Sequence, residues 1–131
     1  MTGILQTFLM VPNATLAFSA SDSPNPVTGT NTTSVSGGLV AVATSSCTCS
    51  VTGGVGSFTY AWTFVSGTNA TINSPSSAST TFTRTAAAPT VLGTSNQYNG
   101  TFRCTVTDTG NGNQTTTADV VVQTNHVYNV I

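Results

Sequence analysis

The side chains that could take part in catalysis are few. His126 is the only histidine, and the acidic residues are Asp22, Asp108 and Asp119, with no glutamate and no lysine in the chain. Nucleophilic catalysis needs a histidine that is oriented by a carboxylate and lies beside a nucleophile. His126 lies near the end of the sequence, in a segment that contains no carboxylate. We therefore expect His126 to make a surface or interface contact, and we expect the protein not to be an enzyme.

Asp108 and Asp119 are the acidic residues that could suggest acid–base chemistry or a calcium site. Asp108 stands at the start of the Gly- and Asn-rich segment 108–113. An aspartate in such a segment commonly accepts a hydrogen bond from the main chain of its own turn. The turn explains Asp108 better, so we expect neither a calcium site nor a catalytic pair.

The three cysteines, Cys47, Cys49 and Cys104, could serve as metal ligands. A structural zinc site takes four cysteine or histidine ligands. Cys47 and Cys49 fall on one expected strand, and no fourth ligand lies near them or near Cys104. We expect no metal and no other cofactor.

The composition excludes several classes of partner. Charged residues make up 4% of the 131 residues, against about 25% in ordinary soluble proteins. Two arginines cannot form the basic patch that binds nucleic acid or an anionic membrane surface, so we expect no nucleic-acid partner and no membrane partner. A nearly neutral surface has little charge repulsion between molecules, which favours contact with neighbouring subunits.

The pattern along the chain is that of an all-β protein. β-branched residues alternate with polar ones between Gly, Asn and Pro, and no stretch has a sustained helical period. We expect an N-terminal arm over 1–12, a sandwich over 13–124 and a C-terminal tail over 125–131. Seven or eight short antiparallel strands are predicted, separated by a loop over 21–33 and a long connection over 86–100. The expected strands cover 14–20, 39–43, 46–52, 58–65, 79–85, 101–107 and 115–123, with brief pairing at 70–72.

The two-residue period of a strand predicts which side chains share an inward face. Those side chains are Cys47, Cys49 and Val51; Tyr60, Trp62 and Phe64; and Phe102, Cys104 and Val106. A tryptophan on one strand with cysteines on two others is the arrangement of immunoglobulin domains. We therefore expect a structural core at Cys49, Tyr60, Trp62, Phe102 and Cys104. Phe102 replaces the usual tyrosine, which keeps the apolar contact and loses a hydrogen bond.

Longer stretches carry a family resemblance. Residues 51–62, 76–82, 102–108 and 118–122 resemble the immunoglobulin-like modules of tailed-bacteriophage structural proteins. The Gly-Gly turn and the Tyr-x-Trp motif are shared with bacterial surface repeats of the polycystic-kidney-disease type. The resemblance covers about 14–123 and implies a protein that decorates capsids or sits on tails and fibres. It also implies weak binding to host or environmental surfaces, such as surface glycans.

The same resemblance makes Cys49 and Cys104 the natural pair if any two cysteines form a disulfide, with Cys47 left over. Such a bond closes a long loop and would add about 4 kcal/mol of stability. Synthesis in the cytosol favours buried thiols that fill space. We favour the reduced state, and oxidation after release from a cell stays open.

The two ends of the chain are the expected partner contacts. The arm lacks the positive region of a signal peptide, and Pro12 ends its apolar run, so we expect a protein made in the host cytoplasm. The arm either supplies the first strand of the sandwich or binds a neighbouring subunit through strand addition or an apolar groove. The candidate contacts are Ile4, Leu5, Phe8, Leu9 and Met10 in the arm, and Val130 and Ile131 in the tail.

These observations predict a non-enzymatic structural protein of a virion, most simply a capsid decoration or cementing protein. Its expected partners are the major capsid or tail protein and sister copies of the chain. A tail or fibre accessory protein is the alternative within the same class. A bacterial cell-surface adhesive or glycan-binding module is the alternative of another class, and the absence of a signal peptide and of internal repeats counts against it.

Overall fold

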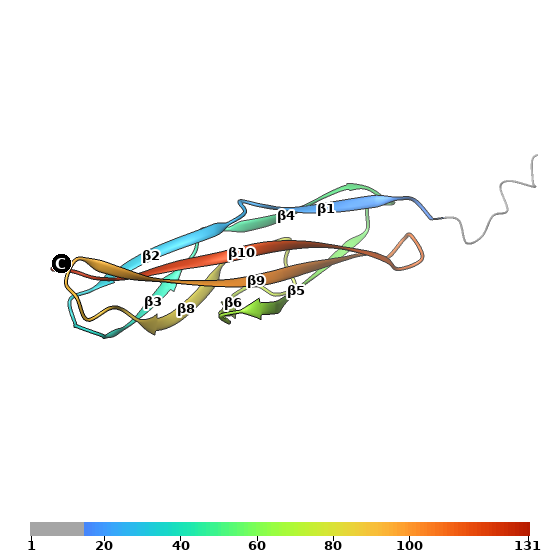
Figure 1. Ribbon diagram of the computed structural model, residues 1–131. Helices are drawn as coiled ribbons and strands as arrows, with labels where there is room; N and C mark the ends of the chain where they lie inside the picture. Colours follow the sequence, from blue (N-terminus) through green and yellow to red (C-terminus); the bar gives the residue numbers. More distant parts are fainter. Residues whose placement is uncertain (1–14) are drawn as a thin grey trace, which may run out of the picture.

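The computed structural model describes residues 15–131 (Figure 1). These residues form ten strands and no helix, so the prediction of an all-β sandwich is confirmed. No helix in this part of the chain is long and apolar enough to cross a membrane. The strands are β1 (Phe18–Ser23), β2 (Val27–Thr33), β3 (Leu39–Ala43), β4 (Cys47–Gly53), β5 (Phe58–Gly67), β6 (Thr71–Ile72), β7 (Ser79–Thr80), β8 (Phe82–Ala87), β9 (Thr94–Asp108) and β10 (Gln114–Tyr128).

The strands form two layers. One layer is a four-stranded sheet in the order β2-β10-β9-β5, and the other consists of two three-stranded sheets, β1-β4-β7 and β3-β8-β6. Every pairing in residues 15–131 is antiparallel except that of β2 with β10, which is parallel. β9 and β10 pair from Asp108 opposite Gln114 to Thr94 opposite Tyr128. These two strands therefore run from one end of the molecule to the other, as Figure 1 shows.

Both short sheets pack on the same face of the four-stranded sheet. Along β10 the inward side chains recur with the two-residue period of a strand, and Val120, Val122 and His126 are all buried. Val120 and Val122 belong to the same core cluster as Cys49 of β4. His126, further along the same face, contacts the main chain of Val40 in β3.

The second layer is broken where β3 gives way to β4 and β7 gives way to β8. Thr44 lies in the first of these breaks and is 6% exposed. Its main-chain N–H donates to the carbonyl of Phe82 at 2.9 Å, and the N–H of Phe82 donates to Thr44 Oγ1 at 3.1 Å. The threonine hydroxyl thus replaces a main-chain acceptor and extends the pairing of β3 with β8 by one residue at the break.

The prediction of a loop over 21–33 is wrong, because this segment contains the end of β1 and all of β2. Pro24 and Pro26 cannot donate main-chain hydrogen bonds, so they end one strand. The chain crosses between the layers at these prolines and resumes at once as β2. Asn25 fixes the crossing, because its Oδ1 accepts the N–H of Val121 at 3.1 Å.

The predicted end of the sandwich at residue 124 is also wrong, because β10 continues to Tyr128. Thr124 and His126 are fully buried in this part of the strand. Their polar side chains obscure the apolar alternation that marks a strand in sequence. His126 therefore lies inside the sandwich, and the expectation that it makes a surface contact is wrong.

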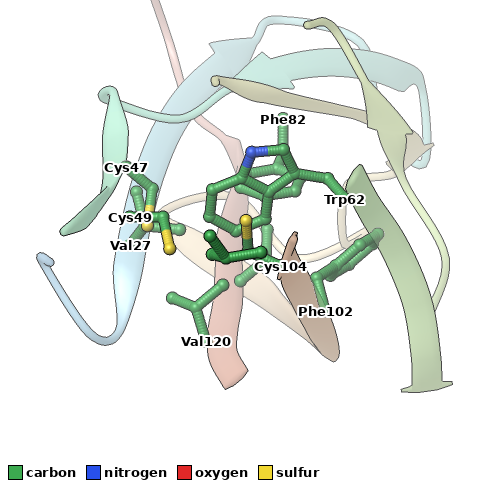
Figure 2. Close-up of a cluster of buried hydrophobic side chains, with 10 residues drawn as sticks. Val27, Cys47, Cys49, Trp62, Phe82, Phe102, Cys104 and Val120 are labelled. Atoms are coloured by element: carbon green, nitrogen blue, oxygen red, sulfur yellow. The ribbon is translucent and has the colours of Figure 1, made fainter. Parts of the chain in front are cut away.

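Trp62 lies at the centre of the main core (Figure 2) and is 3% exposed. It stands opposite Cys104 in the ladder between β5 and β9. Its ring meets that of Phe82 edge to face, with the ring centroids 5.8 Å apart. The indole N–H donates to the carbonyl of Ser77 at 2.7 Å, which satisfies a donor that would be costly to bury alone.

The other expected core residues surround Trp62. Cys49, Phe102 and Cys104 are buried, and Tyr60 is half-buried and packs against the same cluster. All three cysteines are free thiols. Phe64, which the alternation places inward, is 39% exposed, because the register of β5 against β9 shifts directly after it.

Candidate interaction surface

One end of the sandwich carries a patch of exposed aliphatic side chains, which we call the apolar tip. It contains six of the ten large apolar side chains that are exposed in residues 15–131. They come from the β2–β3 segment with the first residue of β3, from the β8–β9 connection and from the residues after β10: Val35, Leu39, Val91, Leu92, Val130 and Ile131. Their exposed fractions range from 54% at Leu92 to 83% at Ile131. Figure 1 shows these three segments meeting at the end where the C-terminus is marked.

Main-chain hydrogen bonds hold the segments of the apolar tip together. The N–H of Gly37 donates to the carbonyl of Pro89 at 2.9 Å, which joins the β2–β3 and β8–β9 connections. The N–H of Gly93 donates to the carbonyl of Tyr128 at 2.8 Å, which joins the second connection to the end of β10. Gly37 and Gly93 have φ of 65° and 81°, a conformation that glycine adopts without steric cost. Main-chain hydrogen bonds therefore fix the relative positions of the segments that form the tip.

The apolar tip contains no charged side chain. The charged residues of the chain all lie elsewhere: Asp22, Arg84, Arg103, Asp108 and Asp119. Exposed apolar side chains gathered at one end of a molecule commonly mark a site of contact with another molecule. The apolar tip is therefore the candidate interaction surface of the described residues.

The sequence anticipates this surface only in part. Val130 and Ile131 belong to it, as expected contacts of the chain end. The expected arm contacts lie outside the described residues: Ile4, Leu5, Phe8, Leu9 and Met10. The sequence did not predict the other four members of the tip as contacts, although the Val91-Leu92 pair gave an indication. These two aliphatic residues lie between Pro89 and Gly93, where a turn usually carries polar side chains.

Asp108 has a structural task that the sequence did not show. It is fully buried, and its Oδ2 accepts the N–H of Val55 at 2.6 Å, in the turn between β4 and β5. Gly54 in that turn has φ of 75°, and a side chain there would collide with the carboxylate. Asp108 therefore fastens a neighbouring turn instead of its own. Asp119 pairs with Arg103 on an exposed face at 2.8 Å, whereas Asp108 is fully buried.

Arg84 is buried, at 3% exposure, and has no ion pair with a carboxylate in the described residues. Its Nε donates to the carbonyl of Asn69 at 3.0 Å, and its Nη2 donates to that of Thr68 at 2.7 Å. Nη1 donates to the carbonyl of Tyr98 at 3.0 Å and to Thr124 Oγ1 at 2.8 Å. Burial lowers the pKa of Arg84. The guanidinium thus links β8, β9, β10 and the segment after β5 through acceptors that carry no charge.

His126 completes this buried polar cluster. Thr124 Oγ1 accepts a hydrogen bond from Arg84, so its own proton is available to His126 Nε2 at 2.9 Å. Nδ1 then carries the ring proton and donates it to the carbonyl of Val40 at 3.0 Å. Burial lowers the pKa of His126, the bond to Val40 opposes this, and the charge of Arg84 lowers it further. The neutral imidazole, with both ring nitrogens hydrogen-bonded, therefore holds β10 against β3.

Asp22 points inward from β1, opposite Cys49. Neither carboxylate oxygen accepts a hydrogen bond from an N–H or hydroxyl group in residues 15–131. Burial raises the pKa of Asp22 to about 6; the Cys49 thiol opposes this as a weak donor, and the charge of Asp119 adds to it. Burial also raises the pKa of Cys47 to about 12 and the pKa values of Cys49 and Cys104. The thiols are therefore protonated at neutral pH, and thiolate chemistry is disfavoured.

The substitution Asp22→Asn is expected to flatten the pH dependence of stability. The pKa of Asp22 is about 6 in the folded protein, against an ordinary value of 3.8, so the folded state binds the proton more tightly. This contribution to stability is full below pH 3.8 and is lost as the pH rises through 6. The variant should therefore exceed the parent in stability above pH 6. Urea unfolding of both proteins between pH 4 and 8 measures this. An unchanged difference between them across that range would contradict it.

A shallow groove of about 350 Å³ lies between the segment that leads into β6 and β8. It is lined by Asn69, Ala70, Thr71, Thr83, Arg84 and Thr85. Arg84 is 3% exposed as a residue, and its guanidinium is hydrogen-bonded to Asn69, Thr68, Tyr98 and Thr124. The groove therefore offers hydroxyl and amide groups without a free charge.

In residues 15–131 no group of three or more histidine, cysteine or acidic side chains is arranged to hold a metal ion. The buried polar groups of this region join strands, and its exposed apolar groups gather at one end. A comparison of the chain with protein-family models, curated proteins and solved structures finds no match.

Proposed function

We propose that this chain is a non-enzymatic structural protein of a virion that decorates and cements the capsid. The observation that carries the proposal is the apolar tip, a fixed surface without charged side chains at one end of a sandwich with few charges elsewhere. Interface cores are depleted of charged residues in the same way. The resemblance of residues 51–62 and 102–108 to modules of tailed-bacteriophage proteins supports the virion as the setting.

A tail or fibre accessory protein is the second candidate. It is favoured by the position of the two ends of the described chain, which lie at opposite ends of the long axis (Figure 1). Thr15 lies close to the β9–β10 turn, whereas Ile131 lies at the apolar tip. Modules with this arrangement can be placed in series along a tail or fibre.

The test uses virus particles that lack this chain because its gene has been deleted. We expect purified protein to bind these particles to a fixed number of copies, measured by gel densitometry, and to form an ordered layer on the head in electron cryomicroscopy. Binding confined to the tail would support the second candidate. The proposal fails if the chain is absent from wild-type particles and does not bind the deleted ones.

A variant carrying Leu39→Ser and Leu92→Ser is expected to bind the particles at least tenfold more weakly. These changes remove exposed aliphatic groups from the apolar tip, each worth about 1 to 2 kcal/mol when buried in a contact. The control is Val65→Ser, which changes a 42% exposed aliphatic residue of β5 outside the tip. Equal occupancy of the parent and the double variant would show that the tip is not used on the particle.

A further inference from the structure

The apolar tip and the point from which the N-terminal arm leaves the described chain lie at opposite ends of the molecule. Thr15 is the first described residue, and its side chain lies near Gly112 in the turn between β9 and β10. Leu16 is held to the same turn by two hydrogen bonds, from its N–H to Asn111 Oδ1 at 2.8 Å and from Asn111 Nδ2 to its carbonyl at 2.7 Å. The apolar tip is at the other end of β9, beside Thr94. The point where the arm joins the sandwich is therefore fixed, and it is far from the tip.

The length of the arm prevents its apolar residues from covering the tip of their own molecule. β9 has 15 residues and spans the distance between the two ends, about 48 Å at the usual rise of a strand. Ile4 is 11 residues from Thr15, and a fully extended chain of that length reaches at most about 40 Å. Met10 is 5 residues from Thr15 and reaches about 18 Å. These residues can therefore reach an apolar tip only on a second copy of the chain.

The chemistry of the two surfaces agrees. Residues 4–11 read Ile-Leu-Gln-Thr-Phe-Leu-Met-Val, with no charged residue and a single amide. The apolar tip likewise presents aliphatic side chains without a charge. Contact between them removes apolar surface from water on both sides and desolvates no charged side chain. Both surfaces, left uncovered, would promote non-specific association.

We propose that residues 4–11 of one copy cover the apolar tip of a second copy, so that copies of this chain join arm to tip. Such a contact unites two different surfaces, and each copy carries one of each. A copy bound through its tip therefore still has a free arm, and association continues beyond the first pair unless the arrangement closes. This inference concerns the contact between copies and stands independently of whether they assemble on a virion.

The test uses two full-length variants, each lacking one of the two surfaces. The arm variant carries Leu5→Ser, Phe8→Ser and Leu9→Ser, and the tip variant carries Leu39→Ser, Leu92→Ser and Ile131→Ser. We expect the parent to form species larger than the monomer in sedimentation velocity, in an amount that rises with concentration. Each variant alone should lose these species completely. An equimolar mixture should form a one-to-one heterodimer and nothing larger, because only one competent arm and one competent tip are present.

The control Val65→Ser should associate like the parent, and near-ultraviolet circular dichroism reports whether each variant is folded. If the tip variant is unfolded, Leu39→Ser alone replaces it, because Leu39 is 73% exposed at the start of β3. Association of the tip variant with itself would show that the arm docks elsewhere, such as on a sheet edge, and would overturn the proposal. A parent that stays monomeric, or a mixture that stays monomeric, would overturn it as well. Failure to bind particles would bear only on the proposed function.

Discussion

Replacing Trp62 by alanine is expected to lower the free energy of unfolding by about 3 to 5 kcal/mol. Trp62 is 3% exposed, packs edge to face on Phe82 and lies opposite Cys104. Its removal leaves a cavity between the layers and leaves the carbonyl of Ser77 without its indole donor. A small domain has only about 5 to 15 kcal/mol of total stability, so the loss is a large part of it.

The matched control is Phe64→Ala, which removes an aromatic side chain from the same strand. Phe64 is 39% exposed, so its loss leaves a smaller cavity and should cost clearly less. Urea unfolding followed by circular dichroism measures both variants. If the Trp62 variant and the parent have the same midpoint of urea unfolding, the indole does not stabilise the core.

The substitution Arg84→Met is expected to cost at least about 3 kcal/mol, because it orphans several acceptors at once. The carbonyls of Thr68, Asn69 and Tyr98 each receive an N–H of this guanidinium. Methionine fills similar space and removes the cost of burying a charge, but it donates no hydrogen bond. The loss of the donors outweighs that gain, since the three carbonyls lie around a buried side chain and lose the hydrogen bonds that it donates.

The chain provides its own control for this prediction, because Arg103 is its other arginine. Arg103 pairs with Asp119 on an exposed face, with 42% and 43% of the two side chains accessible. Exposed ion pairs contribute little to stability, so the Arg103→Met variant should have a melting temperature close to that of the parent. Equal destabilisation by the two substitutions would show that buried acceptors are not what makes Arg84 important.

The sequence predicts the central part of the fold because apolar alternation is strong there. Cys49, Trp62 and Cys104 occur at inward positions of strands whose outward positions are mostly threonine, so the two-residue period is plain. The outer parts of β9 and β10 were not predicted, because their inward positions are polar. The buried Thr124 and His126 find their hydrogen-bond partners in distant segments, at Arg84, 40 residues from Thr124 in sequence, and at Val40. No local pattern reveals such a partner.

The candidate surface was unpredictable for a similar reason. The apolar tip is assembled from three segments that are separated in the sequence, and each contributes only two aliphatic residues. Two exposed aliphatic residues in one loop are unremarkable. Their meaning comes from the hydrogen bonds from Gly37 to Pro89 and from Gly93 to Tyr128, which bring the loops together.

The parallel pairing of β2 with β10 determines how the protein bears mechanical load. The two strands pair from Val27 opposite Val122 to Thr33 opposite Tyr128, and both run toward the apolar tip. The chain enters at the other end through β1, so tension between the two ends of the molecule pulls β2 one way and β10 the other. The force is then directed along the strands, and all the hydrogen bonds between them are sheared together. A ladder loaded in this way must break as a unit, whereas a hairpin pulled open from its end yields one bond at a time.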